Sequence, residues 1–201
     1  IKRHLIDYII KRDTSVVVGA EVPFQYGTRR ADVISILDEI ATAYEIKGAG
    51  DSTERLDYQI KSYKQYFDYC FVVCEKSNLN QIRKAIGHEI GILLVDENGI
   101  TELRKSKQFK RHDKETLAST LPTNRLRVIS QNKELRSKHQ LCEFLAKTKT
   151  LDQLRQYSRS SLNERYKHIS KIFRSELGNT ISSDDILTIT RMPPSNLVRK
   201  S

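Results

Sequence analysis

Short apolar runs with two different periods alternate through the first half of the chain. Apolar residues recur at helical spacing over residues 5–10, so a first helix is expected to end near Asp13. Segments 15–24, 31–37 and 42–47 have the apolar, β-branched composition of strands. Since short turns at 25–28 and 38–39 join them, these three strands are expected to form an antiparallel meander.

A crossover unit is expected next. Gly48-Ala49-Gly50 ends the third strand, and Asp51-Ser52-Thr53-Glu54 has the spacing of a capping box, so a helix is expected from there to about Phe67. Its apolar positions recur every three or four residues and are expected to face a core: Leu56, Ile60, Tyr63 and Phe67. The adjoining stripe holds Arg55, Gln59, Ser62 and Tyr66.

Further strands complete the predicted sheet. Residues 69–74 form a continuous apolar run that is too short for a helix, which is typical of a buried parallel strand. A short helix over 79–86, a buried strand over 91–95 and an edge strand over 100–103 follow. The predicted fold class is therefore α/β, with a mixed central sheet flanked by helices.

The strand signal stops after Lys105, and the apolar residues beyond it recur in helical patterns rich in Lys and Arg. We expect two domains, residues 1–107 with the sheet and residues 108–201 as a basic helical domain. Near the end, 182–189 and 195–200 read as two short helices around Met192-Pro193-Pro194, a loose helix-turn-helix pattern. Paired prolines after a helix are also an ordinary stop signal.

Charge is divided unevenly between the two halves. The chain of 201 residues has a formal net charge of +10. Residues 1–100 carry 13 Lys and Arg against 15 Asp and Glu, and residues 101–201 carry 22 against 10. The positive electrostatic field of the second half attracts polyanions. A basic protein whose charged side chains are only solvated has the same composition. Nucleic acid is the expected partner, and the basic half is the part expected to bind it.

Composition also indicates in which cellular compartment the protein is expected. No run approaches the ~18 apolar residues of a membrane-spanning helix, so no membrane partner is expected. Cys70, Cys74 and Cys142 are too few and too irregular for a disulfide framework, which favours a reducing compartment such as the cytoplasm. Cys70 and Cys74 share one strand face and are expected in the core.

Candidate chemistry lies on the second and third strands. Asp32 follows Arg29 and Arg30, and Glu45 and Lys47 share one strand face because side chains alternate with a period of two. Carboxylate oxygens on adjacent strands suit Mg²⁺, and a nearby ammonium can orient the attacking water.

Each of these residues also has a purely structural interpretation. Asp32 could pair with Arg30 or cap a turn, and Glu45 with Lys47 could be an exposed cross-strand pair. Tyr63 lies on the apolar stripe and is equally compatible with the core.

The quoted residues resemble the PD-(D/E)xK nuclease superfamily, the restriction-endonuclease-like fold, and in particular its small bacterial and phage members. The pattern is Arg29-Arg30-Ala31-Asp32, then Glu45-Ile46-Lys47, then Gln59 to Tyr63, within about residues 1–105. Ala31 stands where the superfamily name has Pro. The resemblance implies catalytic Asp32, Glu45 and Lys47, with metal bound by Asp32, Glu45 and the Ile46 carbonyl. It implies nucleic-acid contacts from the following residues: Arg29, Arg30, Arg55, Gln59 and Tyr63.

The function expected from this resemblance is metal-dependent hydrolysis of phosphodiester bonds, with DNA favoured over RNA and Mg²⁺, or Mn²⁺ as a substitute, as the cofactor. Glu21, near the end of the first strand, is the candidate for a further acid at the metal. The competing hypotheses are a non-catalytic nucleic-acid-binding protein of the same fold and a helix-turn-helix type regulator that binds through its basic half. A homodimer is compatible with each of them.

Overall fold

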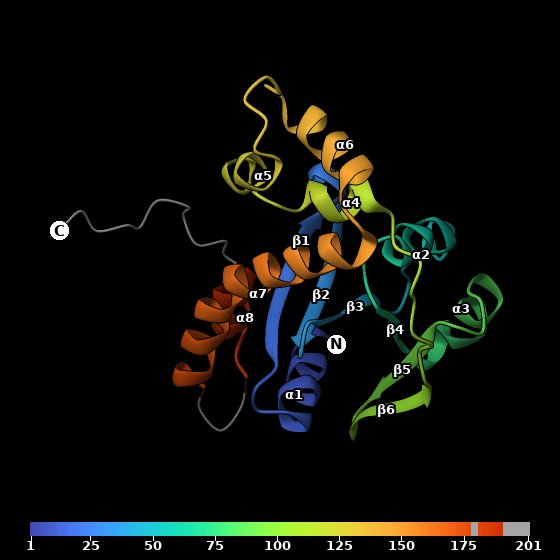
Figure 1. The fold of residues 1–201 in the computed structure, drawn as a ribbon. Coiled ribbons are helices and arrows are strands. Elements are labelled where there is room, and N and C mark those ends of the chain that lie inside the picture. Colours follow the sequence, from blue (N-terminus) through green and yellow to red (C-terminus); the bar gives the residue numbers. More distant parts are fainter. Residues whose placement is uncertain (178–180, 191–201) are drawn as a thin grey trace.

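Six strands form one sheet in the order β1-β2-β3-β4-β5-β6 (Figure 1). The computed structural model describes residues 1–177 and 181–190. The strands are β1 (Val17–Phe24), β2 (Arg29–Leu37), β3 (Ile40–Lys47), β4 (Tyr69–Glu75), β5 (Gly91–Asp96) and β6 (Gly99–Arg104).

Pairing within the sheet is mixed. β1, β2 and β3 pair antiparallel, β3, β4 and β5 pair parallel, and β6 returns antiparallel to β5. The predicted meander, crossover and edge strand are therefore all present, and the α/β class with a mixed sheet is confirmed.

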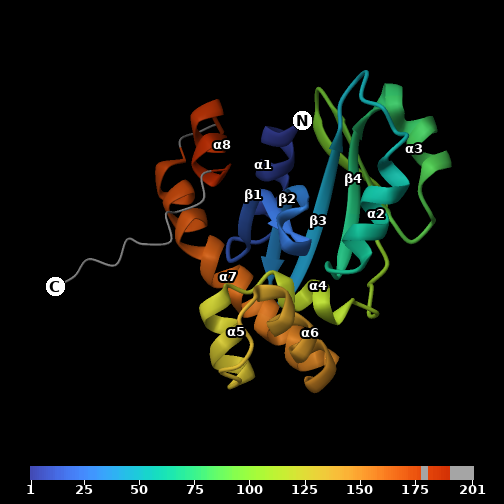
Figure 2. The same cartoon turned by 90° about the horizontal axis from the view of Figure 1, so that it is seen from above.

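Helices cover both faces of the sheet. The helices are α1 (Lys2–Arg12), α2 (Leu56–Lys64), α3 (Leu79–Ala85), α4 (Lys114–Ser119), α5 (Thr123–Ser130), α6 (Lys138–Thr148), α7 (Leu151–Glu176) and α8 (Ser183–Thr190), with 3₁₀ turns η1 (Gln25–Gly27) and η2 (Lys76–Asn78). Figure 2 shows α2 and α3 on one side of the strands, with α4, α5 and α6 gathered at one end. Beyond β6 the described chain is helical, as predicted.

The two faces of β3 belong to different hydrophobic cores. Ala41 and Ala43 pack in the core that includes α2, whereas Tyr44 packs in the core that includes α1. All four apolar positions predicted to face the core are buried: Leu56, Ile60, Tyr63 and Phe67. Cys70 and Cys74 are buried in the α2 core, as predicted. Odd-numbered side chains of β3 therefore point towards α2, and this orientation positions the candidate site.

The predicted capping box before α2 is wrong. The helix begins at Leu56, and its N-cap residue Arg55 makes no side-chain capping bond. Asp51 instead accepts the backbone N–H of Gly48 at 2.7 Å, because the glycine-rich segment turns back on itself there. The helix also ends at Lys64 rather than near Phe67. Tyr66, predicted on the partly polar stripe, is fully buried.

The long helix α7 covers the edge of the sheet at β1 (Figure 1). Ser170 accepts the Val18 backbone N–H at 3.2 Å, and Arg174 donates to the Val16 carbonyl. Edge strands have unpaired backbone groups that invite association, and these contacts satisfy two such groups near β1. The domain boundary predicted at residue 107 falls between β6 and α4, while buried residues from both sides of it share the α2 core. The division into two domains stays a prediction.

The predicted helix at 182–189 is α8, and Ser182 and Asp185 cap it reciprocally. The rest of the helix-turn-helix pattern, Met192-Pro193-Pro194 and 195–200, lies outside the described residues. Within 1–177 and 181–190, no helix has both the length and the apolar character needed to cross a membrane.

Candidate active site

Glu45 and Lys47 form a buried ion pair on the α2 face of β3. Their period-two spacing puts both side chains on that face, where Glu45 is 2% exposed and Lys47 is 9% exposed. The Lys47 Nζ lies 3.0 Å from Glu45 Oε1. The alternative of an exposed cross-strand pair is wrong, because α2 packs over both residues. Buried charges are costly unless they are paired or bind an ion, so this pair is a candidate functional feature.

Helix α2 supplies the partners that hold this pair. Gln59 Nε2 donates to Glu45 Oε1 at 2.5 Å, and Gln59 Oε1 accepts from Lys47 Nζ at 3.1 Å. Tyr63, one turn later on the same helix face, donates to Glu45 Oε2 at 2.5 Å. Burial and the Glu45 charge raise the pKa of the Tyr63 hydroxyl well above its usual value, which keeps it protonated and donating. Gln59 and Tyr63 thus orient Glu45 and Lys47.

Asp32 joins the cluster where β2 and β3 stop pairing. The last pair is Val33 with Tyr44, and one step further the Asp32 carboxylate accepts the backbone N–H of Ile46 at 2.8 Å. Burial and the nearby Glu45 charge raise the pKa of Asp32 to about 6, although the Ile46 hydrogen bond opposes this rise. Asp32 does not form the alternative ion pair with Arg30; instead, Arg30 pairs with Glu21.

Glu21 lies opposite Asp32 in the β1–β2 register, because Ala20 pairs with Val33 and Val22 with Ala31. Its backbone has a φ of 53°, a left-handed conformation that is strained for a residue with a side chain. Across this position the even-numbered residues of β1 change faces, since Ala20 packs in the α1 core and Val22 in the α2 core. Strain of this kind is concentrated at functional sites.

The Glu21 carboxylate pairs with Lys2 Nζ at 2.6 Å and with Arg30 Nε at 3.3 Å. Its negative charge also contributes to the raised pKa of Asp32, while Lys2 acts in the opposite direction. Lys2 has no signal in the sequence that would place it here, because only the folding of α1 onto the sheet brings it to Glu21. The structure therefore brings three acids, Glu21, Asp32 and Glu45, into one electrostatic cluster.

The donor set of this cluster fits Mg²⁺ in chemistry. Carboxylates of Asp32 and Glu45 and the Ile46 carbonyl are hard oxygen ligands, and the pKa of Asp32 is raised first by burial and then by the nearby Glu45 charge. In the described residues, no group of three or more His, Cys, Asp or Glu side chains is already arranged around an ion position. Since Lys47, Gln59 and Tyr63 all contact Glu45, ion binding requires Glu45 to exchange at least one of these contacts.

The remaining predicted contact residues lie on β2 and at the start of α2, the elements that carry this cluster's Asp32, Gln59 and Tyr63. Arg29 stacks on Tyr58, with its guanidinium carbon 4.1 Å from the ring centroid. The Arg30 carbonyl lies 3.3 Å from the Tyr63 hydroxyl, and Arg55 is exposed at the start of α2. Tyr58 was not predicted from the sequence as a contact residue. Its position directly before Gln59 was the signal that could have identified it.

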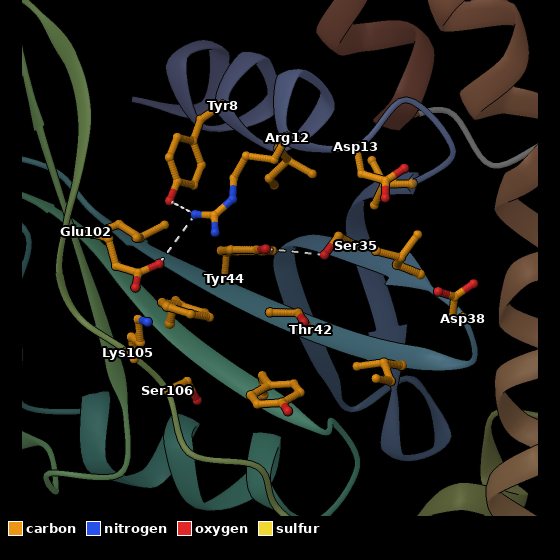
Figure 3. Close-up of a pocket in the computed structure, with 17 residues that line it drawn as sticks. Tyr8, Arg12, Asp13, Ser35, Asp38, Thr42, Tyr44, Glu102, Lys105 and Ser106 are labelled. Atoms are coloured by element: carbon orange, nitrogen blue, oxygen red, sulfur yellow. Dashed lines mark hydrogen bonds and ion pairs between the residues drawn. The ribbon is translucent and has the colours of Figure 1, made fainter.

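A cavity of about 450 Å³ lies on the opposite face of the sheet, beneath α1 (Figure 3). Tyr44 and Phe71 stack in its lining with ring centroids 5.6 Å apart, and Arg12 pairs with Glu102 at 3.4 Å. Burial raises the pKa of Tyr44 to about 12. Tyr44 precedes Glu45 but points to the other face, and none of the predicted site residues lines this cavity. The candidate active site and the cavity are therefore separate.

The fold and the cluster define an α/β protein with a buried carboxylate–lysine site. The sequence model of the bacteriophage P4 protein cII family matches residues 1–190, and the chain belongs to this family. It is 25% identical to protein cII of Enterobacteria phage P4, over 95% of this chain and 76% of that protein. The SPO1766 protein of unknown function from Silicibacter pomeroyi matches with 18% identity and a TM-score of 0.40, covering 70% of this chain and 87% of that one. A TM-score of this size is too low to indicate a common fold.

The expected membership of the PD-(D/E)xK nuclease superfamily is wrong. The family that matches is a phage protein family, and it covers residues 1–190 rather than only the first half. The resemblance relied on a few acids, one lysine and one helix face, and such short patterns arise wherever a buried carboxylate–lysine pair lies on a strand beside a helix. The expectation of a phage protein is confirmed by the family.

Replacing Asp32 with Asn is expected to stabilise the metal-free protein above pH 6. Because folding raises the pKa of Asp32 to about 6, ionisation of this residue destabilises the folded state. The loss of unfolding free energy caused by Asp32 ionisation is absent below about pH 4 and grows as the pH rises. It is complete above about pH 6, where it reaches about 1–3 kcal/mol. Thermal unfolding in EDTA at pH 4 and pH 8 measures the effect. Equal unfolding temperatures of the variant and the unchanged protein at pH 8 would contradict this assignment.

Proposed function

We propose that this protein is a metal-dependent hydrolase of phosphodiester bonds in nucleic acid, with DNA favoured over RNA. The observation that supports the proposal best is the buried Glu45–Lys47 pair, oriented by Gln59 and Tyr63 and adjacent to Asp32. A carboxylate cluster next to a buried ammonium suits hydrolysis of a phosphate diester, because the two groups serve different parts of the reaction.

Each residue has a separate role in the proposed reaction. Asp32, Glu45 and the Ile46 carbonyl would hold the ion, with Glu21 as the further acid. Bound Mg²⁺, or Mn²⁺ in its place, supplies the positive charge that neutralises the phosphate and lowers the pKa of water. Lys47 orients the attacking water through its Nζ, and Gln59 holds Lys47 in position through its Oε1. Tyr63 fixes the Glu45 carboxylate.

The basic half of the chain supports nucleic acid as the partner. Residues 101–201 carry 22 Lys and Arg against 10 Asp and Glu, so phosphate neutralisation by this half would add affinity without sequence preference. Arg29 and Arg30 on β2 and Arg55 at the start of α2 add positive charge on the elements that carry part of the cluster.

One observation favours a second candidate, a non-catalytic nucleic-acid-binding protein. Glu45 already receives contacts from Lys47, Gln59 and Tyr63, and such a closed network can stabilise a fold without any ion. In that case the basic half would bind nucleic acid and the cluster would be structural.

Cleavage of supercoiled plasmid DNA and of a labelled single-stranded DNA separates the two candidates. We expect cleavage with Mg²⁺ or Mn²⁺, none with EDTA, and none with Glu45→Ala. Glu164→Ala is a matched control, because Glu164 pairs with Arg125 on an exposed helix surface and should not affect the rate. RNA treated in parallel tests the preference for DNA. Binding of DNA without cleavage under every ion condition would favour the second candidate.

A further inference from the structure

Two tyrosines are the most exposed aromatic side chains in the part of the chain that the structure describes. Tyr58 on α2 is 56% exposed and Tyr26 in η1 is 39% exposed. Arg29 packs on Tyr58, with its guanidinium carbon 4.1 Å from the ring centroid, whereas the Tyr26 hydroxyl donates to Glu115. More than half of the Tyr58 side chain is exposed even with Arg29 over its ring. An exposed aromatic ring next to an arginine is a surface on which a nucleic-acid base can stack.

The Arg29–Tyr58 pair is directly adjacent to the candidate active site on both of its elements. Tyr58 precedes Gln59, which bridges Glu45 and Lys47, and Arg29 precedes Arg30, whose carbonyl lies 3.3 Å from the Tyr63 hydroxyl. A group that stacks on this pair would therefore contact β2 and α2, the elements that carry Asp32, Gln59 and Tyr63. The hydrogen bond from Arg29 to the Tyr58 hydroxyl helps to hold the guanidinium over one face of the ring.

We infer that Arg29 and Tyr58 form a stacking platform for an unpaired base, so that the substrate of the proposed nuclease is single-stranded at the site. This inference rests on the proposed function and names its substrate class. Aromatic rings and arginine planes bind bases through their faces, and these faces are accessible only where a strand is unpaired. A duplex offers its backbone to such a surface, and contact with a duplex backbone needs no exposed ring.

Binding in EDTA tests the platform without requiring cleavage. The probe is fluorescently labelled oligothymidylate, alone or annealed to its adenine complement, and anisotropy gives the two dissociation constants. We expect tighter binding of the single strand. Tyr58→Ala should weaken single-strand binding by about 5- to 100-fold, the range for loss of one base–aromatic stack, and should leave duplex binding nearly unchanged. Tyr58→Phe keeps the ring and should bind the single strand almost as well as the unchanged protein.

The chain offers a matched control at Tyr8. Arg12 lies over the Tyr8 ring at 5.1 Å, so the same kind of pair exists beneath α1 on the other face of the sheet. Tyr8→Ala should leave single-strand binding unchanged. An unchanged constant for Tyr58→Ala, or an equal loss for the single strand and the duplex, would overturn the platform. Because these measurements need no turnover, a protein that fails to nick DNA can still show the single-strand preference, and the two failures stay distinct.

Discussion

Replacing Lys47 with Ala is expected to reduce the cleavage rate by about 10²- to 10⁴-fold, the usual contribution of one positioned proton-transfer or orienting group. Lys47 is 9% exposed and its ammonium contacts both Glu45 and Gln59, so bulk water cannot easily replace it. Since Lys47 is assigned to the water and not to the ion, Mn²⁺ binding measured by titration calorimetry should persist in the variant.

Lys64 provides the control for this prediction. It also lies on the α2 side of the sheet, and its Nζ lies 2.6 Å from Glu89 Oε1. Glu89 is not part of the cluster. Lys64→Ala should therefore change cleavage by less than a few-fold. Equal loss of Mn²⁺ binding and cleavage in Lys47→Ala would show that the lysine maintains the ion site instead of acting on the water.

The second large effect concerns stability. Arg159 of α7 donates through Nε to Asp68 Oδ2 at 2.9 Å, and the two residues are 1% and 3% exposed. Asp68 Oδ2 also accepts the Ala41 backbone N–H at 2.8 Å, so one carboxylate connects α7 to the start of β3. Asp68→Ala is expected to cost about 3–5 kcal/mol of unfolding free energy, because it leaves a buried guanidinium without its counter-charge. Urea unfolding measures this loss.

A double variant shows whether the loss comes from the unpaired charge. Asp68→Ala combined with Arg159→Leu removes both charges and should recover part of the stability lost in Asp68→Ala. Glu164→Ala breaks the exposed pair with Arg125 and should cost less than about 1 kcal/mol. A loss of that small size in Asp68→Ala would mean that the helical half and the sheet are joined mainly by apolar packing.

Strand positions could be predicted because local apolar periodicity and short turns determine them. The period-two spacing placed Glu45 and Lys47 on one face, and the structure confirms that both point towards α2. The start of α2 was predicted wrongly because the Asp51 side chain accepts the Gly48 backbone N–H and does not cap the helix. Lys2 and Glu21 are 19 positions apart in the sequence, and Asp68 and Arg159 are 91 positions apart. Tertiary folding creates such contacts, and no local pattern encodes them.

Five of the candidate site residues were predicted from the sequence, but their family was not. Asp32, Glu45, Lys47, Gln59 and Tyr63 do converge in space. The family assigned to them was nevertheless wrong, because short motifs share residue types across unrelated families, whereas the cII family match extends over residues 1–190. The chemistry of the cluster, and not a family name, is therefore the basis of the proposed activity.

Single-turnover cleavage of one labelled DNA in Mg²⁺, by the unchanged protein and by Glu45→Gln, tests this activity most directly. Gln has the same length as Glu and can still accept the Tyr63 hydrogen bond, but it lacks the charge needed to bind the ion and to pair with Lys47. We expect cleavage by the unchanged protein and a loss of at least about 10²-fold in Glu45→Gln, measured at a temperature where both proteins are folded. Equal cleavage by both proteins, or none by either, would contradict the proposed activity.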